Sequence, residues 1–264
     1  MDITHENLKS TALDIGRRMA VDQWPAKRTS IELINASKSY GVQNGVQMRG
    51  LESVSLNIAA GEYVIVLGKS GSGKSTLLNL VAGLDRASSG IVCVAGQNLG
   101  ESSENTMAQW RGRNIGVVFQ FFQLLPTLTI LENVMLAMEF VGVIAPAARR
   151  ARAQALIAQV GIAEQAHKLP SELSGGQQQR AAIARAMAND PPIILADEPT
   201  GNLDSETAMA ICEVFASLAQ QGKTLLVVTH DAKLAQSAHR VIRIHDGAIA
   251  DDMQLPELQK AVQQ

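Results

Sequence analysis

Hydrophobic residues fall into several short continuous runs that are rich in β-branched side chains, the clearest being YVIVLG at residues 63–68. A run of this kind is typical of a strand buried on both faces. The same pattern predicts strands over 114–120, 192–197, 224–230 and 240–247. Two earlier segments, 30–40 and 51–58, alternate between apolar and polar residues and predict half-buried strands.

Between these strands the apolar spacing changes to that of helices, most clearly over residues 206–220. Alternating strands and helices predict a mostly parallel sheet that is covered on both faces. No strand pattern occurs between Leu128 and Met187, where 149–162 and 177–188 have helical periodicity. The sequence therefore predicts an α/β domain with a helical insertion.

These patterns divide the chain into three segments. An N-terminal extension covers residues 1–29, with a short helix over Leu8–Met19. The main domain covers residues 30–250, with the helical subdomain at about 121–187. Residues 251–264 then form a short C-terminal tail.

The composition, 46% hydrophobic and 18% charged residues, fits a folded domain with a sizeable core. A net charge of −2 disfavours nucleic acid as a partner. The two cysteines have no metal-type spacing and are predicted to be buried apolar residues. The N-terminus lacks the pattern of a signal peptide, and polar residues interrupt the apolar stretch Ile115–Ala148. We therefore expect a soluble chain.

GKSGSGKST, at residues 68–76, has the spacing G-x-x-x-x-G-K-[ST]. Its glycines allow backbone N–H groups to turn toward phosphate oxygens. A flexible glycine loop is the alternative, but the position between a buried strand and an apolar helix favours a phosphate site. Lys74 would reach the β- and γ-phosphates, and Ser75 would bind Mg²⁺. The predicted ATP-binding residues of this loop are Gly68, Ser70, Gly71, Ser72, Gly73, Lys74, Ser75 and Thr76.

Two carboxylates end the apolar strand predicted over 192–197. Asp197 is placed to hold Mg²⁺, and Glu198 to polarise an attacking water as a base. Acidic pairs also end strands at protein surfaces, but Pro199 and the wholly apolar strand favour a site here. His230 ends another buried strand, where it either contacts the γ-phosphate or has a structural role.

Together, these residues resemble the ABC-type ATPases, the nucleotide-binding subunits of ATP-binding cassette systems. The resemblance covers roughly residues 31–250 and rests on several motifs in the family's order. The loop 68–76 and IILADE are similar to the Walker A and Walker B motifs. Tyr40 is similar to the aromatic residue that stacks on adenine, Gln120 to the glutamine of the Q-loop, and His230 to the switch histidine. LSGGQ (173–177) is similar to the family signature, and GNLDS (201–205) to the D-loop.

The resemblance implies a P-loop NTPase (RecA-like) fold, in which a mostly parallel sheet core carries an antiparallel β subdomain and an inserted α-helical signature subdomain. It implies ATP and Mg²⁺ as cofactors and hydrolysis of ATP to ADP and phosphate. The catalytic residues are then Glu198, His230, Gln120 and Lys74, and the Mg²⁺ ligands are Ser75, Gln120 and Asp197.

The signature belongs to the helical insertion, so it is expected to lie away from the phosphate loop of its own chain. A two-fold homodimer solves this problem, because each signature then caps the ATP of its partner. The residues acting in trans would be Ser174, Gly175, Gly176, Gln177 and Asp204.

GLDRASSG, FFQLLPTLTILENV and DEPTGNLDSETA resemble the subgroup of the macrolide exporter MacB, the lipoprotein-release ATPase LolD and the division protein FtsE. This subgroup implies a peripheral subunit at the cytoplasmic face of a bacterial inner membrane. Its partners would be two few-helix permease subunits with large extracytoplasmic domains, and a periplasmic adaptor. An FtsE-like regulator of envelope remodelling is the main alternative. A soluble ABC ATPase that acts on DNA, on ribosomes or in cluster assembly fits the sequence less well. A phosphate-loop kinase would leave the signature motif unexplained.

Overall fold

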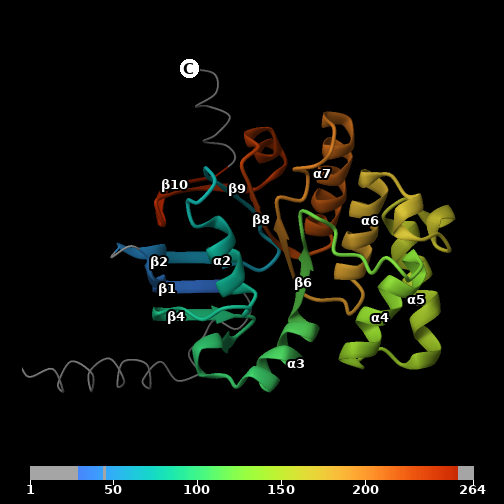
Figure 1. The fold of residues 1–264 in the computed structure, drawn as a ribbon, viewed down its shortest axis with the longest axis horizontal. Helices are drawn as coiled ribbons and strands as arrows, with labels where there is room; N and C mark the ends of the chain where they lie inside the picture. Colours follow the sequence, from blue (N-terminus) through green and yellow to red (C-terminus); the bar gives the residue numbers. More distant parts are fainter. Residues whose placement is uncertain (1–28, 44–45, 255–264) are drawn as a thin grey trace, which may run out of the picture.

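The computed structural model describes residues 29–43 and 46–254, and the helix predicted over Leu8–Met19 lies outside the described residues. Figure 1 shows a central sheet with a second, smaller sheet on one side and a group of helices on the other. The helices are α2 (Lys74–Val81), α3 (Glu104–Asn114), α4 (Ile130–Val141), α5 (Pro146–Gln159), α6 (Gly175–Ala186) and α7 (Ser205–Gln220). Short 3₁₀ turns occur at Leu99–Glu101, Ala163–Gln165, Pro170–Glu172 and Ala232–Ser237.

The central sheet has six strands in the order β10-β9-β3-β8-β7-β6, and all of them except β10 run parallel. Five of the strands are the buried runs predicted from the sequence. The bounds are β3 (Tyr63–Leu67), β6 (Ile115–Val118), β7 (Ile193–Asp197), β8 (Thr224–Thr229), β9 (Arg240–His245) and β10 (Ala248–Gln254). The carboxyl ends of β3, β8, β7 and β6 therefore lie side by side at one edge of the sheet.

The smaller sheet is antiparallel, with the strand order β2-β1-β4-β5. Its strands are β1 (Thr29–Gln43), β2 (Val46–Ala59), β4 (Ser89–Val94) and β5 (Gln97–Asn98). The two alternating segments predicted from the sequence lie within β1 and β2, whereas β4 and β5 were not predicted.

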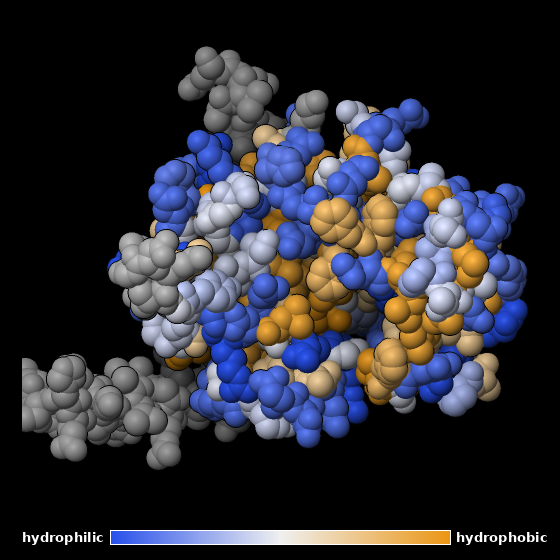
Figure 2. All heavy atoms as spheres, viewed as in Figure 1, coloured by the Kyte–Doolittle hydropathy of each residue, from blue (hydrophilic) through white to orange (hydrophobic). Residues whose placement is uncertain are grey.

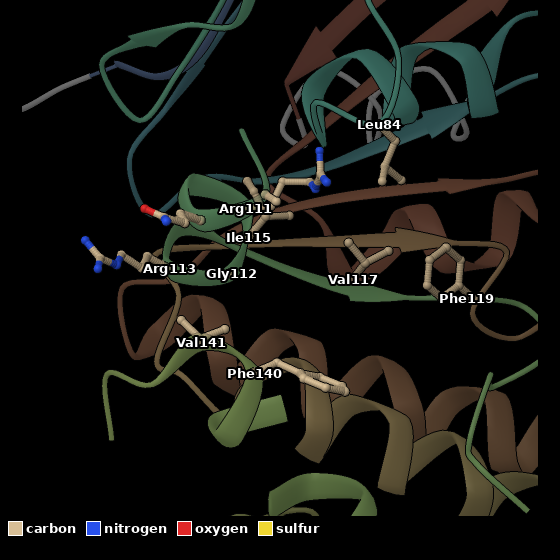
Figure 3. A pocket seen from close by; sticks show the side chains of 11 residues that line it. Leu84, Arg111, Gly112, Arg113, Ile115, Val117, Phe119, Phe140 and Val141 are labelled. Carbon is tan, nitrogen blue, oxygen red and sulfur yellow. The ribbon is translucent and has the colours of Figure 1, made fainter. Parts of the chain in front are cut away.

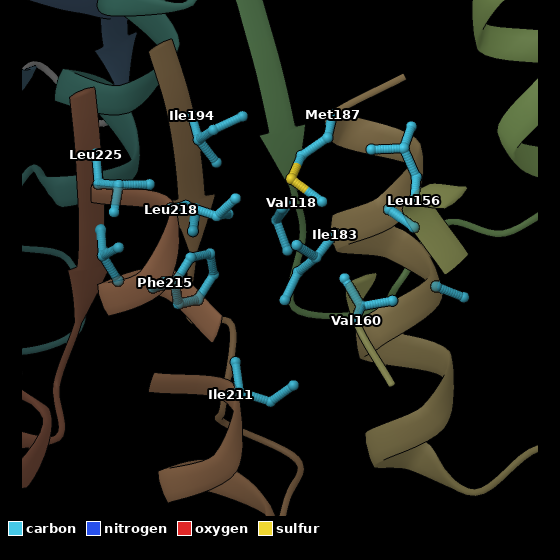
Figure 4. Packing of buried hydrophobic residues seen from close by; sticks show 14 of the residues in the cluster. Val118, Leu156, Val160, Ile183, Met187, Ile194, Ile211, Phe215, Leu218 and Leu225 are labelled. Carbon is cyan, nitrogen blue, oxygen red and sulfur yellow. The ribbon is translucent and has the colours of Figure 1, made fainter. Parts of the chain in front are cut away.

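Two separate hydrophobic clusters cover the two faces of the central sheet. Along β3, Tyr63 and Ile65 belong to the cluster that includes α4 to α7, and Val64 and Val66 belong to the cluster that includes α2 and the smaller sheet. This alternation explains why β3 reads as a continuous apolar run. Figure 4 shows the first cluster, where the side chains of α6 meet Val118 of β6.

The structure adds α3 and α4 to the helices that the sequence specified by residue range, and it differs from the sequence prediction at β10. The apolar stretch that we assigned to core or interface contains α4, which begins at a capping box formed by Thr129 and Glu132. Strand β10 extends to Gln254, so residues 251–254 belong to the sheet and not to a tail. Its acidic residues pair with arginines of β9, Asp252 with Arg240 and Asp251 with Arg243.

Candidate functional site

The loop between β3 and α2 has the shape of a phosphate cradle. Gly71 and Gly73 have positive φ angles of 78° and 107°. A Cβ atom at Gly73 would lie 2.4 Å from the carbonyl oxygen of Gly50, so this position requires glycine. The buried Lys74 Nζ donates to the carbonyls of Gly68 and Lys69 at 2.8 and 3.0 Å, and thus lies inside the loop.

The loop also contains a polar atom that fits a phosphate ligand. The Ser72 hydroxyl is buried and has no hydrogen-bond partner among the described residues. Buried hydroxyls are rarely left unpaired, and a phosphate oxygen bound in the loop would supply an acceptor. The helix α2 begins at Lys74, so its first N–H groups point to the same region.

The predicted Mg²⁺ ligands Ser75 and Asp197 come together, although they are far apart in sequence. The Ser75 hydroxyl donates to Asp197 Oδ1 at 3.4 Å. Burial raises the pKa of the Asp197 carboxyl, and the neighbouring Glu198 adds to this shift. A divalent cation would offset the charge, so the pair fits Mg²⁺. Residues 29–43 and 46–254 contain no group of three or more His, Cys, Asp or Glu side chains that could hold a metal ion.

Glu198 is held in a defined orientation by the end of β8. Its Oε2 accepts a hydrogen bond from the Thr229 hydroxyl at 3.0 Å and one from the His230 backbone N–H at 3.2 Å. The His230 Nδ1 atom lies 2.9 Å from the same oxygen. The other carboxylate oxygen, Oε1, lies 3.9 Å from Lys74 Nζ. The φ angle of Glu198 is 45°, which is unusual for a residue other than glycine. Unusual backbone conformations of this kind are common at functional sites.

Two predicted residues have neighbours that the sequence did not indicate. His230 contacts Glu198, although a contact with the γ-phosphate was one of its two readings. The Gln120 amide lies near Gly201, since a Cβ there would be 3.1 Å from Gln120 Nε2. Within the described ranges, no hydrogen bond joins the side chain of Gln120 to Ser75 or Asp197. The structure therefore assembles the pair Ser75 and Asp197 without Gln120.

Tyr40 lies next to the loop, but its position depends on residues that sequence reasoning missed. Its hydroxyl donates to the Thr76 hydroxyl at 3.3 Å, and the Lys38 ammonium lies 5.1 Å from its ring centroid. A Cβ at Gly50 would come within 2.7 Å of the Tyr40 ring and 2.9 Å of Thr76. Because an isolated glycine within a strand often marks a close backbone approach, Gly50 was the one available signal.

The signature residues form the beginning of α6. Ser174 and Gln177 make a capping box, in which the Ser174 Oγ accepts from the Gln177 N–H at 3.3 Å and the Ser174 N–H donates to the Gln177 side chain at 2.9 Å. The helices α2 and α6 pack into opposite clusters, on opposite faces of the central sheet (Figure 1). The start of α6 is thus separated by the sheet from the cluster that contains the chain's own phosphate-loop helix.

Gly176 and Asp204 also have roles within their own chain. A Cβ at Gly176 would lie 2.3 Å from Cγ2 of Thr207, so Gly176 is packed against α7. The Asp204 carboxylate caps α7 by accepting from the N–H groups of Glu206 and Thr207 and from the Thr207 hydroxyl. These bonds, those from Thr207 first, lower the pKa of Asp204.

The fold and the site together define a nucleotide-binding domain of the phosphate-loop class. The model of the ABC transporter family matches residues 51–201, more than half of the chain, and the chain belongs to this family. It is an ABC transporter ATP-binding domain with the P-loop NTPase fold that the sequence predicted, and its enzymatic class is that of an ATPase.

Relatives of several kinds share this domain. An uncharacterized ABC transporter ATP-binding protein of Thermotoga maritima is 48% identical over 219 residues, which cover 83% of the chain and 93% of the relative. The macrolide export ATP-binding/permease protein MacB of Hyphomonas neptunium is 43% identical over 222 residues, which are 84% of the chain and 34% of that protein. A solved dimeric structure of the ATP-binding cassette MJ0796, in a post-hydrolysis state bound to ADP and Pi, has a TM-score of 0.79 and 41% identity, covering 85% of the chain and 98% of the cassette.

Proposed function

We propose that this chain is the ATP-hydrolysing subunit of an ABC-type membrane complex, and that it dimerises on ATP to drive a separate permease in export or mechanotransmission. The observation that carries this proposal is the position of the signature. A capped helix start with the signature glycines lies on the other face of the sheet from α2, so it needs a second chain to supply a phosphate. The dimeric cassette with 41% identity supports this arrangement.

In the proposed site, the phosphate loop binds the triphosphate while Tyr40 stacks on the adenine. Lys74 would release the carbonyls of Gly68 and Lys69 and turn to the β- and γ-phosphate oxygens, which are stronger acceptors for an ammonium. Mg²⁺ would be held by Ser75, Asp197 and Gln120, and when bound it offsets the negative charge on the phosphates. Gln120 must then leave its place near Gly201, which makes it a sensor of the occupied site.

Glu198 is the proposed base for the attacking water. Three donors bind Oε2 of Glu198 and fix the plane of its carboxylate. The other oxygen, Oε1, then lies on the side that faces Lys74. His230 and Thr229 orient Glu198, as a third side chain orients the catalytic base in enzymes with an activated nucleophile. Ser174, Gly175, Gly176 and Gln177 of the partner would close the site, and Asp204 would support the junction between the two sites.

Asp197→Asn should stabilise the fold while it abolishes Mg²⁺-dependent hydrolysis. Burial raises the pKa of Asp197 in the folded state above its pKa in the unfolded state. The contribution of this carboxyl to the free energy of unfolding is therefore fully present below the unfolded-state pKa, and it is lost as the pH rises through the folded-state pKa. An asparagine at this position does not ionise, so the variant keeps its stability as the pH rises. The variant should therefore have a higher Tm than the wild type at neutral pH, and the difference should vanish in acid.

Thermal unfolding over a pH series and phosphate release measure both effects of this substitution. Glu213→Gln is the control for hydrolysis, because Glu213 is an exposed carboxylate on α7. A lower Tm for Asp197→Asn at neutral pH would contradict the prediction.

The permease needs a docking surface, and the structure offers a hollow of about 640 Å³ between α3, β6 and α4 (Figure 3). Leu84, Val117 and Phe119 line it on one side and Phe140 and Val141 on the other. Figure 2 shows apolar side chains gathered over this part of the molecule. Two arginines of α3, Arg111 and Arg113, add positive charge to the lining. The hollow thus fits a short permease helix that has an apolar face and an acidic side chain.

Residues 121–131, which follow Phe119 of the lining along the chain, are a second candidate for contact with the permease. Phe121 and Leu125 are exposed there, at 68% and 45%. Leu124, by contrast, packs against the core, and Phe122 lies near Gly175. Of these four apolar side chains, Phe122 and Leu124 pack against the protein itself and are less suited to docking than Phe121 and Leu125.

Phe140→Ala should weaken capture of the permease by about 10- to 100-fold, the range for an aromatic side chain at the centre of an interface. Phe140 is 81% exposed, so its truncation leaves the core intact. The tagged chain would be used to capture membrane proteins from detergent extracts, with identification by mass spectrometry. Met209→Ala removes a 65% exposed apolar side chain on α7, away from the hollow, and should capture the same protein as the wild type. Equal capture by Phe140→Ala would contradict the docking site.

The captured partner also decides between the transport function and the FtsE-like alternative. A few-helix permease with a large extracytoplasmic domain, together with a periplasmic adaptor, supports export. A division-type membrane partner supports a regulator of envelope remodelling. Within the described residues no helix is long and apolar enough to cross a membrane. We place the chain at the cytoplasmic face of the inner membrane through its permease, and the bacterial relatives support a bacterial setting.

A further inference from the structure

Arg185, on the helix α6, binds the backbone of the segment that follows Gln120. Its Nη2 donates to the carbonyl oxygen of Phe122 at 2.8 Å, and its Nη1 donates to that of Gln123. The guanidinium thus joins the signature helix to residues 62 and 63 positions away in sequence. Among the described residues no carboxylate forms an ion pair with Arg185, so the two carbonyls are its partners.

The bound backbone has an unusual conformation. Phe122 and Gln123 have φ angles of 54° and 53°, in the left-handed region that residues other than glycine rarely adopt. Two such residues in a row persist only when the surroundings fix them. One planar guanidinium that binds both carbonyls provides this restraint, since its donors form a rigid fork.

A second contact joins the same segment to the signature. The Cζ atom of Phe122 lies 3.8 Å from the position that a Cβ of Gly175 would occupy, so the ring lies close to the first signature glycine. The segment after Gln120 therefore contacts α6 at its beginning, through Phe122, and near its end, through Arg185. Burial lowers the pKa of the Arg185 guanidinium. The residue nevertheless stays charged at neutral pH, because arginine has a very high pKa.

We propose that Arg185 is a positioning residue that couples Gln120 to the signature helix. This inference rests on the proposed function, in which Gln120 senses the occupied site and the signature caps the ATP of the partner. A movement of Gln120 toward ATP and Mg²⁺ pulls on Phe122 and Gln123, and Arg185 transmits this pull to α6. Occupancy of one site thereby orients the signature that completes the other site.

A double-mutant cycle on the full chain tests this coupling. Arg185→Met and Gln120→Ala should each lower kcat about tenfold, and the double variant should stay within about twofold of Gln120→Ala, since both changes break the same link. Binding of a fluorescent ATP analogue to Arg185→Met should stay within about threefold of the wild type, because the phosphate loop is untouched. In the Glu198→Gln background, Arg185→Met should also reduce the ATP-dependent dimer.

Arg180→Met is the matched control, because Arg180 lies on the same helix and donates to the carbonyl of Val160 at 2.7 Å, away from the segment after Gln120. It should lower Tm as Arg185→Met does, but keep kcat within about twofold of the wild type. Arg185→Lys retains the charge without the fork, and it replaces the Met variant in the cycle if that variant does not fold.

Several outcomes would overturn the coupling. These are losses of Arg185→Met and Gln120→Ala that multiply in the double variant, a wild-type kcat for Arg185→Met, and an equal loss for Arg180→Met. A wild-type kcat for Gln120→Ala would instead contradict the proposed function of Gln120. The dimer measurement then decides on Arg185 alone, since an unchanged dimer fraction refutes the link and a reduced one supports it.

Discussion

Glu198→Gln should lower the kcat of ATP hydrolysis by about 100- to 1,000-fold and leave a stable ATP-bound dimer. The amide oxygen of glutamine can still accept the hydrogen bonds from the Thr229 hydroxyl and the His230 N–H, so the side chain keeps its orientation. It can no longer take a proton from water. ATP binding, which depends on the phosphate loop, should be retained, and the step that separates the two chains should be blocked.

Phosphate release measures the rate, and gel filtration with ATP measures the dimer. Glu213→Gln is the matched control, because Glu213 is an exposed carboxylate on α7 outside the site. Hydrolysis by Glu198→Gln at the wild-type rate would show that another group is the base. Loss of ATP binding would show instead that the carboxylate is needed for the shape of the loop.

Ser174→Arg should abolish hydrolysis, by about 100-fold or more, while ATP binding stays within about threefold of the wild type. Ser174 is exposed and caps α6, and the proposed dimer places the partner's ATP at this helix start. A long arginine side chain would fill that space. Its charge also opposes the positive end of the helix dipole. The helix α2, which follows the phosphate loop of the same chain, packs on the other face of the sheet, so ATP binding at this loop should be unaffected.

Ser103→Arg provides the control for the lost helix cap. Ser103 caps α3 and accepts from the Thr106 N–H at 3.3 Å, the same distance as in the cap at Ser174. Both substitutions should cost about 1 kcal/mol of stability, but only Ser174→Arg should block hydrolysis. Equal activity of the two variants would contradict action in trans. Gly176→Asp is a poorer test, because Gly176 has no room beside Thr207 and the change would disturb packing with α7.

The parallel sheet and the phosphate loop could be predicted from the sequence because their signals are local. A continuous apolar run marks β3, and the glycine spacing after it marks the cradle. Since parallel strands align their carboxyl ends, Asp197, Glu198 and His230 could be assigned to one edge before their distances were known.

Other features depend on contacts between distant residues, which the sequence does not display. Two acidic residues of β10 are paired with arginines of β9, Asp252 with Arg240 and Asp251 with Arg243. Gly50 is required by the approach of Tyr40 and Thr76, and the role of Arg185 depends on a backbone 62 residues away. Local propensity carries no information on such pairs.

The two hydrophobic clusters lie on either side of the central sheet and have no described side chain in common, since alternate residues of β3 belong to different clusters. Substitutions in α4 and α5 are therefore separated by the sheet from the packing around α2. The part of the proposed docking hollow that α4 contributes, Phe140 and Val141, can therefore change to suit a new membrane partner while the packing of α2 is preserved. In this architecture, the same ATPase domain is compatible with different membrane partners.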